Sequence, residues 1–255
     1  MGVLAEILEE KRREIQALRS RPLPRGFEPR PVDLARTSGA PLRLIAEIKR
    51  RSPSAGELST RLGADERAAA YAEAGASMVS VLTDARFFGG SFDDLRACRE
   101  RVSVPLLCKE FVLDELQLDW ARASGADAVL LIVRCLEPSL LERLVRAARD
   151  RGLSPLVEVV SEAEARTAIS AGADWIGVNA RDLDTLTLDP SRATRVLECV
   201  PSEMCRVHLS GLATEADVAA VRDRAVDAAL IGQALMERDD PGPFLRALVR
   251  AAAGG

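Results

Sequence analysis

Short, continuously apolar segments rich in valine, isoleucine and leucine recur along the chain, and longer segments of helical character follow them. Continuous apolar runs of this length are typical of parallel strands buried on both faces. Their starts are about 20–35 residues apart, the length of one strand–helix unit. We predict eight strands, at Arg43–Ile48, Met78–Leu82, Pro105–Cys108, Ala128–Val133, Pro155–Val159, Trp175–Val178, Cys205–Leu209 and Ala228–Ile231.

The segments between these strands are rich in alanine, arginine, glutamate and leucine, and several begin with a capping Ser, Thr or Asp. A weak internal repeat places Gly75, Gly125 and Gly172 between a helix and the next strand, where a left-handed glycine ends a helix. Predicted helices include Asp65–Ala74, Asp114–Ser124, Ser139–Arg151, Ser161–Ala171 and Thr214–Arg224.

Eight such units without a break in composition predict one α/β domain, a single (β/α)8 TIM barrel. A doubly wound open sheet, the alternative, usually has a glycine-rich turn after its first strand, and here Lys-Arg-Arg-Ser-Pro follows Ile48. Helical spacing of apolar residues adds an N-terminal amphipathic helix at Val3–Leu18, followed by a proline-rich linker at Arg21–Pro41. We therefore divide the chain into an extension, 1–41, and the barrel, 42–255. The extension either fills the bottom of the barrel or covers the mouth of its active site.

Composition narrows the function classes. With 35 basic and 39 acidic side chains and a net charge of −4, nucleic acid and anionic membranes are disfavoured as partners. The longest apolar run, Ala128–Val133, is far too short to span a bilayer, and early glutamates exclude a signal peptide. The five cysteines contain no C-x-x-C pair and His208 is the one histidine, which excludes a Cys/His zinc site and indicates reduced thiols in a cytoplasmic protein. We expect no metal site.

Only three of the 35 basic residues are lysines, namely Lys11, Lys49 and Lys109. A lysine that persists in a chain whose cations are otherwise arginines is a candidate for a specific role. Lys11 belongs to the charged N-terminal helix, where we expect a solvent-exposed side chain. Lys49 and Lys109 instead follow apolar strands.

The carboxyl ends of barrel strands are where active sites are built. Glu47 and Lys49 lie on the same side of the first strand by its two-residue period. Lys109 and Glu158 end two other strands. A buried charge costs several kcal/mol unless it is paired, so four charges at one rim indicate an acid–base site. We expect an apolar pocket to lower the pKa of such a lysine toward neutrality and to raise that of a glutamate.

The last two predicted strands end in glycine-containing turns. Ser210-Gly211 and Gly232 can present backbone N–H groups to an anion, aided by a helix N-terminus. These two strands are where barrels often bind phosphate. The sequence therefore predicts a phosphate site at this part of the rim.

Aromatic residues make up only 4% of the chain, yet Phe87, Phe88 and Phe111 cluster after two neighbouring strands. Such a cluster packs in a core or forms the wall of a site for a planar substrate. Both interpretations are open at this point.

With these residues the chain resembles the indole-3-glycerol-phosphate synthase family of tryptophan biosynthesis over nearly its whole length. The motifs that carry the resemblance are Ala46–Ser54, Phe88–Ser91, Leu107–Phe111, Leu156–Val159 and Gly177–Leu183. The resemblance implies a carboxy-lyase without cofactors. It would close the ring of 1-(2-carboxyphenylamino)-1-deoxyribulose 5-phosphate and release CO2 and water to give indole-3-glycerol phosphate.

By the same resemblance, Lys109 is the general acid of ring closure and Glu158 an acid or base of the later dehydration. Glu47 and Lys49 assist proton transfer, and how the acid and base roles divide among the four stays open. The implied substrate-binding residues are Ser52, Phe88, Phe111, Leu130, Asn179, Arg181 and Leu209. The implied phosphate-binding residues are Ser210, Gly211, Gly232 and Gln233.

One position departs from the family, which usually has Glu-Ser-Gly where this chain has Leu209-Ser210-Gly211. The preceding residue, usually small, is His208, and a lone histidine in a strand is more often structural than catalytic. Two alternatives to the synthase follow: a paralogous cyclase of specialised metabolism acting on a related or substituted anthranilate adduct, and a catalytically silent phosphate-binding barrel. We expect a small phosphorylated substrate as the partner, and a monomer or weak homodimer.

Overall fold

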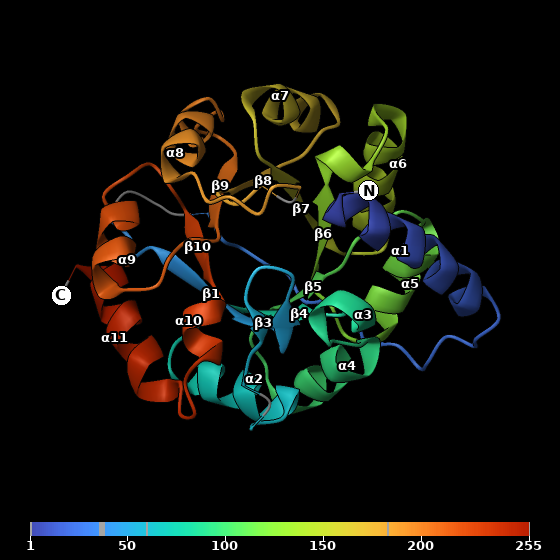
Figure 1. Cartoon of the computed structure of the whole chain (residues 1–255), viewed down its shortest axis with the longest axis horizontal. Helices are drawn as coiled ribbons and strands as arrows, with labels where there is room; N and C mark the ends of the chain where they lie inside the picture. The colour runs from blue at the N-terminus through green and yellow to red at the C-terminus, as the bar shows by residue number, and fades with distance from the viewer. Residues whose placement is uncertain (1, 36–38, 60, 183, 255) are drawn as a thin grey trace.

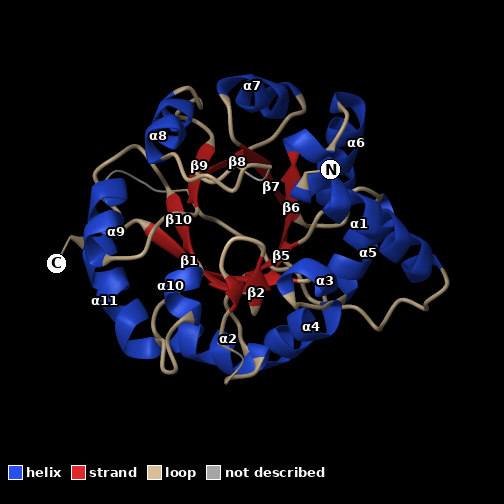
Figure 2. Cartoon of the chain, in the orientation of Figure 1, coloured by secondary structure: helices blue, strands red, loops and turns tan. Residues whose placement is uncertain are grey.

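The structure is a computed structural model that describes residues 2–35, 39–59, 61–182 and 184–254. Within them, eight parallel strands close into a barrel in the order β1-β10-β9-β8-β7-β6-β5-β4, which confirms the predicted fold. Figure 2 shows this ring of strands with helices around it. The barrel strands are β1 (Arg43–Ile48), β4 (Met78–Leu82), β5 (Leu106–Lys109), β6 (Ala128–Ile132), β7 (Ser154–Val159), β8 (Trp175–Asn179), β9 (Cys205–Leu209) and β10 (Ala228–Ile231).

Each predicted helix is present, and three of them begin with the capping residue that the sequence predicts. Asp114, Ser161 and Thr214 are N-caps whose side chains accept backbone N–H groups. The helices are α1 (Val3–Arg19), α2 (Ala64–Glu73), α3 (Ala85–Phe88), α4 (Phe92–Arg101), α5 (Glu115–Ala123), η1 (Val133–Cys135), α6 (Pro138–Asp150), α7 (Glu162–Ser170), α8 (Pro190–Glu198), α9 (Glu215–Arg222), α10 (Gln233–Met236) and α11 (Gly242–Ala253). A small antiparallel hairpin, β2 (Arg51–Ser52) with β3 (Gly56–Glu57), follows β1.

The repeated glycines end their helices as predicted. Gly75, Gly125 and Gly172 have φ values of 96°, 95° and 82°, in the left-handed region that glycine adopts without strain. Each turns the chain from a helix directly into the next barrel strand. The internal repeat therefore marks the same helix-to-strand turn at three positions.

Strand side chains alternate between two separate apolar cores. Ile45, Leu107 and Leu156 belong to the core inside the barrel. Their neighbours Leu44 and Leu106 belong to the core between the barrel and its surrounding helices. Because successive residues of a strand point to opposite faces, this alternation decides which polar residues at the strand ends face the barrel interior.

The N-terminal extension serves both ends of the barrel. Ile7 of α1 packs into the inner core with Phe111, near the carboxyl ends of the strands. In Figure 1, α1 (dark blue) begins near β6 and runs outward from the strand ring over α5. At the opposite end, Leu34 of the linker is fully buried in the same core, and the Arg30 N–H donates to Asp127 Oδ1 at 2.6 Å, just before β6. The two interpretations of the extension thus apply to different parts of it.

Three other expectations concern the chain as a whole. No helix of the described residues is long and apolar enough to cross a membrane. All five cysteines are free. The division at residue 41 between extension and barrel stays a prediction, and residues 36–38 of the linker lie outside the described part.

Candidate active site

A cavity of about 320 Å³ opens at the carboxyl ends of the barrel strands. Its lining includes every residue for which the sequence predicts a role in catalysis or binding. These are Glu47, Lys49, Ser52, Phe88, Lys109, Phe111, Leu130, Glu158, Asn179, Arg181, Leu209, Ser210, Gly211, Gly232 and Gln233. The structure therefore brings together residues from all parts of the barrel sequence.

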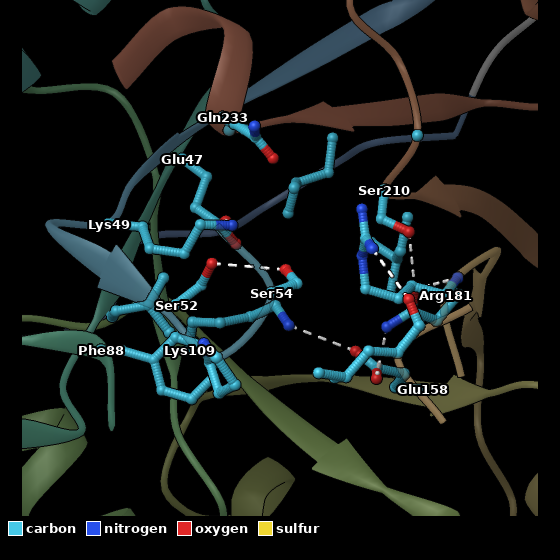
Figure 3. A pocket seen from close by; sticks show the side chains of 18 of the residues that line it. Glu47, Lys49, Ser52, Ser54, Phe88, Lys109, Glu158, Arg181, Ser210 and Gln233 are labelled. Carbon is cyan, nitrogen blue, oxygen red and sulfur yellow. Dashed lines mark hydrogen bonds and ion pairs between the residues drawn. The ribbon is translucent and has the colours of Figure 1, made fainter. Parts of the chain in front are cut away.

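Two ammonium–carboxylate pairs face this cavity (Figure 3). Lys109 Nζ lies 3.2 Å from Glu158 Oε2, and Lys49 Nζ lies 2.8 Å from Glu47 Oε1. The two carboxylates are almost completely buried, whereas the two lysine side chains keep some exposure. Each buried carboxylate is thus compensated by a lysine that can still reach a ligand.

Strand register explains why these four side chains meet. Glu47 follows Ile45 by two residues, Lys109 follows Leu107, and Glu158 follows Leu156 in the same way. Since the earlier residue of each pair points into the barrel, the later one does so too, one layer nearer the mouth. Lys49 continues the same alternation beyond β1, as its spacing from Glu47 predicts.

The pairing reverses the pKa shifts expected from burial alone. Burial lowers the pKa of Lys109, but the carboxylates of Glu158 and Glu47 outweigh it, so the pKa is raised. Burial likewise raises the pKa of Glu47, but the ammonium groups of Lys49 and Lys109 lower it further than burial raises it. The expectation of a lysine shifted toward neutrality is wrong for Lys109, because its pocket contains paired carboxylates. Lys109 is protonated at neutral pH.

An amide links the acid–base pairs to the next part of the rim. Asn179 Nδ2 donates to Glu158 Oε1 at 2.9 Å. Asn179 Oδ1 accepts from Ser210 Oγ at 2.7 Å and from the Arg181 N–H at 2.9 Å. Arg181 itself donates from Nη1 to the Leu186 carbonyl at 3.0 Å. The second oxygen of Glu158 is thereby fixed.

The predicted phosphate rim is built mainly from backbone. Ser210 and Gly211 have φ values of 69° and 85°, so two successive residues are left-handed where β9 ends. A Cβ on Gly232 would lie only 2.6 Å from Glu47 Oε1, so any larger residue there must displace Glu47. The Gln233 side chain donates to Glu237 Oε1 at 2.9 Å, and its backbone N–H lies in the first turn of α10, where helix N–H groups can bind an anion.

Aromatic and apolar side chains close the opposite wall. The rings of Phe88 and Phe111 have centroids 6.0 Å apart, and both line the cavity with Leu130. Val3 and Ile7 of α1 complete this wall from above. All three rings pack in or against the inner core, and Phe88 and Phe111 also line the cavity, whereas Phe87 does not.

Several lining residues were not singled out from the sequence, among them Ser54, Glu110, Leu186, Leu188 and Glu237. Most lie in loops, whose course the periodicity of strands and helices does not predict.

The expectation that the Lys11 side chain is solvent-exposed is wrong. Lys11 is 1% exposed rather than solvated, because it points under α1 toward two strand ends. The signal was available: Lys11 is one of only three lysines, and it lies on the apolar face of the helix, four residues after Ile7.

Comparisons with known proteins agree with one another. The family model described as "Indole-3-glycerol phosphate synthase" matches residues 4–248. A protein of that name from Mycolicibacterium vanbaalenii is 44% identical, over 88% of this chain and 83% of its own. Another, from an Exiguobacterium species, is 39% identical over 97% and 96%.

Solved structures show the same fold at much lower identity. A 3-hexulose-6-phosphate synthase is similar with a TM-score of 0.68 at 18% identity, covering 82% of this chain and 99% of that one. A thiamine phosphate pyrophosphorylase from Pyrococcus furiosus has a TM-score of 0.64 at 18% identity, covering 84% and 96%. At this identity the likeness concerns the barrel alone.

Proposed function

The chain belongs to the indole-3-glycerol phosphate synthase family, and from that membership we propose how its cavity carries out the synthase reaction. The enzyme is a carboxy-lyase of tryptophan biosynthesis that binds a phosphorylated substrate. It converts 1-(2-carboxyphenylamino)-1-deoxyribulose 5-phosphate to indole-3-glycerol phosphate, CO2 and water. The roles of individual residues below are our proposal.

Ring closure needs an acid at the ketone of the substrate. The aromatic carbon that bears the carboxylate attacks the ketone carbon, and the ketone oxygen must take up a proton. We assign that proton to the ammonium of Lys109, which the neighbouring carboxylates keep protonated. Loss of CO2 then restores the aromatic ring and leaves a hydroxyl on the new five-membered ring.

Dehydration needs a group that moves a proton while this hydroxyl leaves as water. Glu158 lies 3.2 Å from Lys109 Nζ and is oriented by Asn179, so a proton can pass between lysine, carboxyl group and substrate over hydrogen-bond distances. The ring loses one further proton to complete the indole. The pair acts as one acid–base unit, and we propose that Glu158 serves this second stage.

Lys49 and Glu47 form the second unit. The substrate brings a carboxylate and a phosphate, and Lys49 is a partly exposed ammonium that can approach either. Glu47 holds Lys49 in place and lies directly beneath Gly232. We propose that Lys49 binds an anionic group of the substrate and that Glu47 assists proton transfer.

The remaining contacts position the substrate. We propose that Phe88, Phe111 and Leu130 sandwich the anthranilate ring. Backbone N–H groups of Ser210, Gly211, Gly232 and Gln233 bind the phosphate at the start of the short α10. Ser52, Asn179, Arg181 and Leu209 contact the carboxylate and the sugar-derived chain. The expectation that the reaction needs no metal or organic cofactor stays a prediction.

The observation that carries this proposal is the convergence of two lysine–glutamate pairs on one cavity that also has an aromatic wall and a backbone-lined rim. The test is to incubate the purified protein with the carboxyphenylamino-deoxyribulose phosphate and to follow indole fluorescence and CO2 release. We expect both products in equal amounts. A folded protein that releases neither would overturn the assignment and favour the silent phosphate-binding barrel.

The paralogous cyclase has one observation in its favour, the buried apolar side chain of Leu209 at the mouth. Comparing kcat/KM for the unsubstituted substrate and for ring-substituted anthranilate adducts tests it. A higher kcat/KM on a substituted adduct would favour specialised metabolism.

We propose a monomer or weak homodimer in the cytoplasm. Leu23 and Leu188 are the only exposed large hydrophobic residues in the described part of the chain, so it offers no broad apolar face for a stable dimer. Five free cysteines suit a reducing compartment. Sedimentation velocity over a range of protein concentrations tests the oligomeric state.

A further inference from the structure

A buried cluster of charges beneath α1 takes no part in the proposed chemistry. Lys11 Nζ lies 2.8 Å from Glu110 Oε1 and 3.0 Å from Asp84 Oδ2, and it also contacts the Glu14 carboxylate. Lys11, Asp84 and Glu110 are all at most 3% exposed. Burying three charged groups costs several kcal/mol of desolvation free energy, so we expect this cluster to have a specific role.

The two strand-end carboxylates each hold the backbone of an aromatic residue in the cavity wall. Asp84 follows β4 and caps α3, with Oδ1 accepting from the Phe87 and Phe88 N–H groups at 2.7 and 3.3 Å. Glu110 follows β5, and its Oε1 accepts from the Phe111 N–H at 2.7 Å. The same cluster thus fixes the backbones from which Phe88 and Phe111 project.

A single ammonium spans the two carboxylates. Asp84 presents its free oxygen to Lys11, and Glu110 presents the oxygen that also binds the Phe111 backbone. The other Glu110 oxygen accepts from Thr83 Oγ1 at 2.8 Å. Without Lys11, the carboxylates of Asp84 and Glu110 would face each other's charge in a buried site.

The helix that carries Lys11 also carries part of the cavity wall. Ile7 lies one helical turn before Lys11 and Val3 two turns before it, so the three side chains share one face. Val3 and Ile7 line the cavity that Phe88 and Phe111 also line. Lys11 therefore connects α1 to the two loops that carry Phe88 and Phe111. These three segments enclose one part of the cavity, which we call the aromatic slot.

We propose that Lys11 is a positioning residue that sets the width and shape of the aromatic slot by tying α1 to the two loops bearing Phe88 and Phe111. Its role rests on the proposed function, in that the slot holds the planar ring of the substrate. It acts through Asp84 and Glu110 and does not touch the reacting atoms. Its loss weakens substrate binding more than it slows chemistry.

Lys11→Met tests this by removing the charge while keeping the length of the side chain. We expect KM for the carboxyphenylamino-deoxyribulose phosphate to rise about tenfold or more, since two buried carboxylates lose their counter-charge, with kcat within about threefold. Calorimetric binding of indole-3-glycerol phosphate should weaken by a similar factor. Arg12→Met, the same loss of charge one residue away on the exposed face, is the matched control and should leave both constants unchanged.

The split between KM and kcat separates positioning from simple structural damage. Partial unfolding lowers the active fraction and therefore kcat, whereas a distorted slot raises KM.

Restoring charge balance provides the rescue. In K11M/E110Q, one negative charge is removed while the amide oxygen can still accept the Phe111 N–H, so KM should return to within about threefold of wild type. Wild-type KM in folded Lys11→Met, or a fall in kcat as large as the rise in KM, would overturn the proposal. If Lys11→Met does not fold, the double variant decides alone: near-wild-type KM supports the proposal and a raised KM overturns it. An inactive wild type would instead overturn the proposed function.

Discussion

The two sides of the cavity differ in the groups that accommodate charge: paired side chains on one side and backbone on the other. On the side of β1, β5 and β7, four charged side chains form two close pairs, Lys49 with Glu47 and Lys109 with Glu158. On the side of β9 and β10, no described lining residue from Leu209 onward is a lysine or arginine, and the rim is formed by glycines and left-handed backbone.

This difference matches two chemical demands. Proton transfer needs groups that change charge, and close pairing keeps each buried carboxylate compensated through the cycle. An anion that is only held needs fixed donors, and backbone N–H groups supply them without side-chain entropy. Glu47 joins the two sides, because it pairs with Lys49 and lies against Gly232.

On the charged side, we expect the largest loss of activity from substitution of Lys109. Lys109→Arg keeps the positive charge, but a guanidinium does not release a proton near neutral pH. We expect kcat to fall at least about a hundredfold, the usual scale for losing a general acid. Steady-state kinetics by indole fluorescence measures it, with circular dichroism as the control for folding. Near-wild-type kcat in this variant would remove Lys109 from the acid role.

The outward face of β9 offers the next largest effect, on stability rather than catalysis. Burial, and secondly Arg224, lower the pKa of His208 to about 4 from 6.5, and its Nδ1 has no hydrogen-bond partner. The unfolded chain therefore binds more protons between pH 6.5 and 4, so stability is full above pH 6.5 and falls as the pH drops to 4. The loss should be roughly 2–4 kcal/mol in the free energy of unfolding.

His208→Leu should remove this component. Urea unfolding of wild type and variant at pH 4, 5.5 and 7 measures the difference, and the variant curve should be flatter by that amount. Kinetics at pH 7 should stay close to wild type, since His208 is not among the lining residues. Parallel curves would show that His208 is not the group responsible.

The backbone-lined side is tested at Gly232. An added Cβ would lie 2.6 Å from Glu47 Oε1, so Gly232→Ala must displace either the phosphate rim or Glu47. Losing one hydrogen bond to a charged group costs about 1.5–3 kcal/mol, so inorganic phosphate and substrate should bind about tenfold to a hundredfold more weakly. Calorimetry measures this, with Gly26→Ala, a linker glycine with ordinary space around its Cα, as control. Unchanged phosphate affinity would place the anion elsewhere.

How much of this comparison is visible in the sequence differs between the sides. The acid–base side is predictable because Glu47, Lys109 and Glu158 end apolar strands whose two-residue period fixes their direction, and the strand limits agree within about a residue. The phosphate rim is predictable as a location only. That a Cβ at Gly232 would meet Glu47 depends on two strands far apart in the sequence.

The N-terminal extension shows what sequence cannot supply. Its amphipathic pattern predicts a helix, but which surface the helix covers depends on tertiary packing. The sequence therefore predicts a solvent-exposed Lys11, because it does not show that Asp84 and Glu110 lie beneath the helix. Likewise the pKa of Lys109 follows from how close the two carboxylates come, and a burial argument alone gives the wrong direction.

The smallest expected effect comes from giving the backbone-lined side a charge. Leu209 is 1% exposed and packs over Gly177, beside the Ser210 hydroxyl that binds Asn179. A glutamate there can accept hydrogen bonds from substrate hydroxyls, which leucine cannot. One such bond contributes about 0.5–1.5 kcal/mol, so Leu209→Glu should raise kcat/KM for the unsubstituted substrate several-fold, to about tenfold at most.

Leu209→Gln separates hydrogen bonding from charge at this position. If hydroxyl contacts dominate, Gln should give part of the gain, and if the ammonium groups across the cavity matter, only Glu should. The carboxylate must also lose its hydration in a buried site, which limits the gain and explains why leucine is compatible with activity. An unchanged or lower kcat/KM for Leu209→Glu, together with no effect of His208→Ala, would show that this departure from the family has no bearing on its ordinary substrate. The ring-substituted adducts would then be the substrates on which to compare leucine and glutamate.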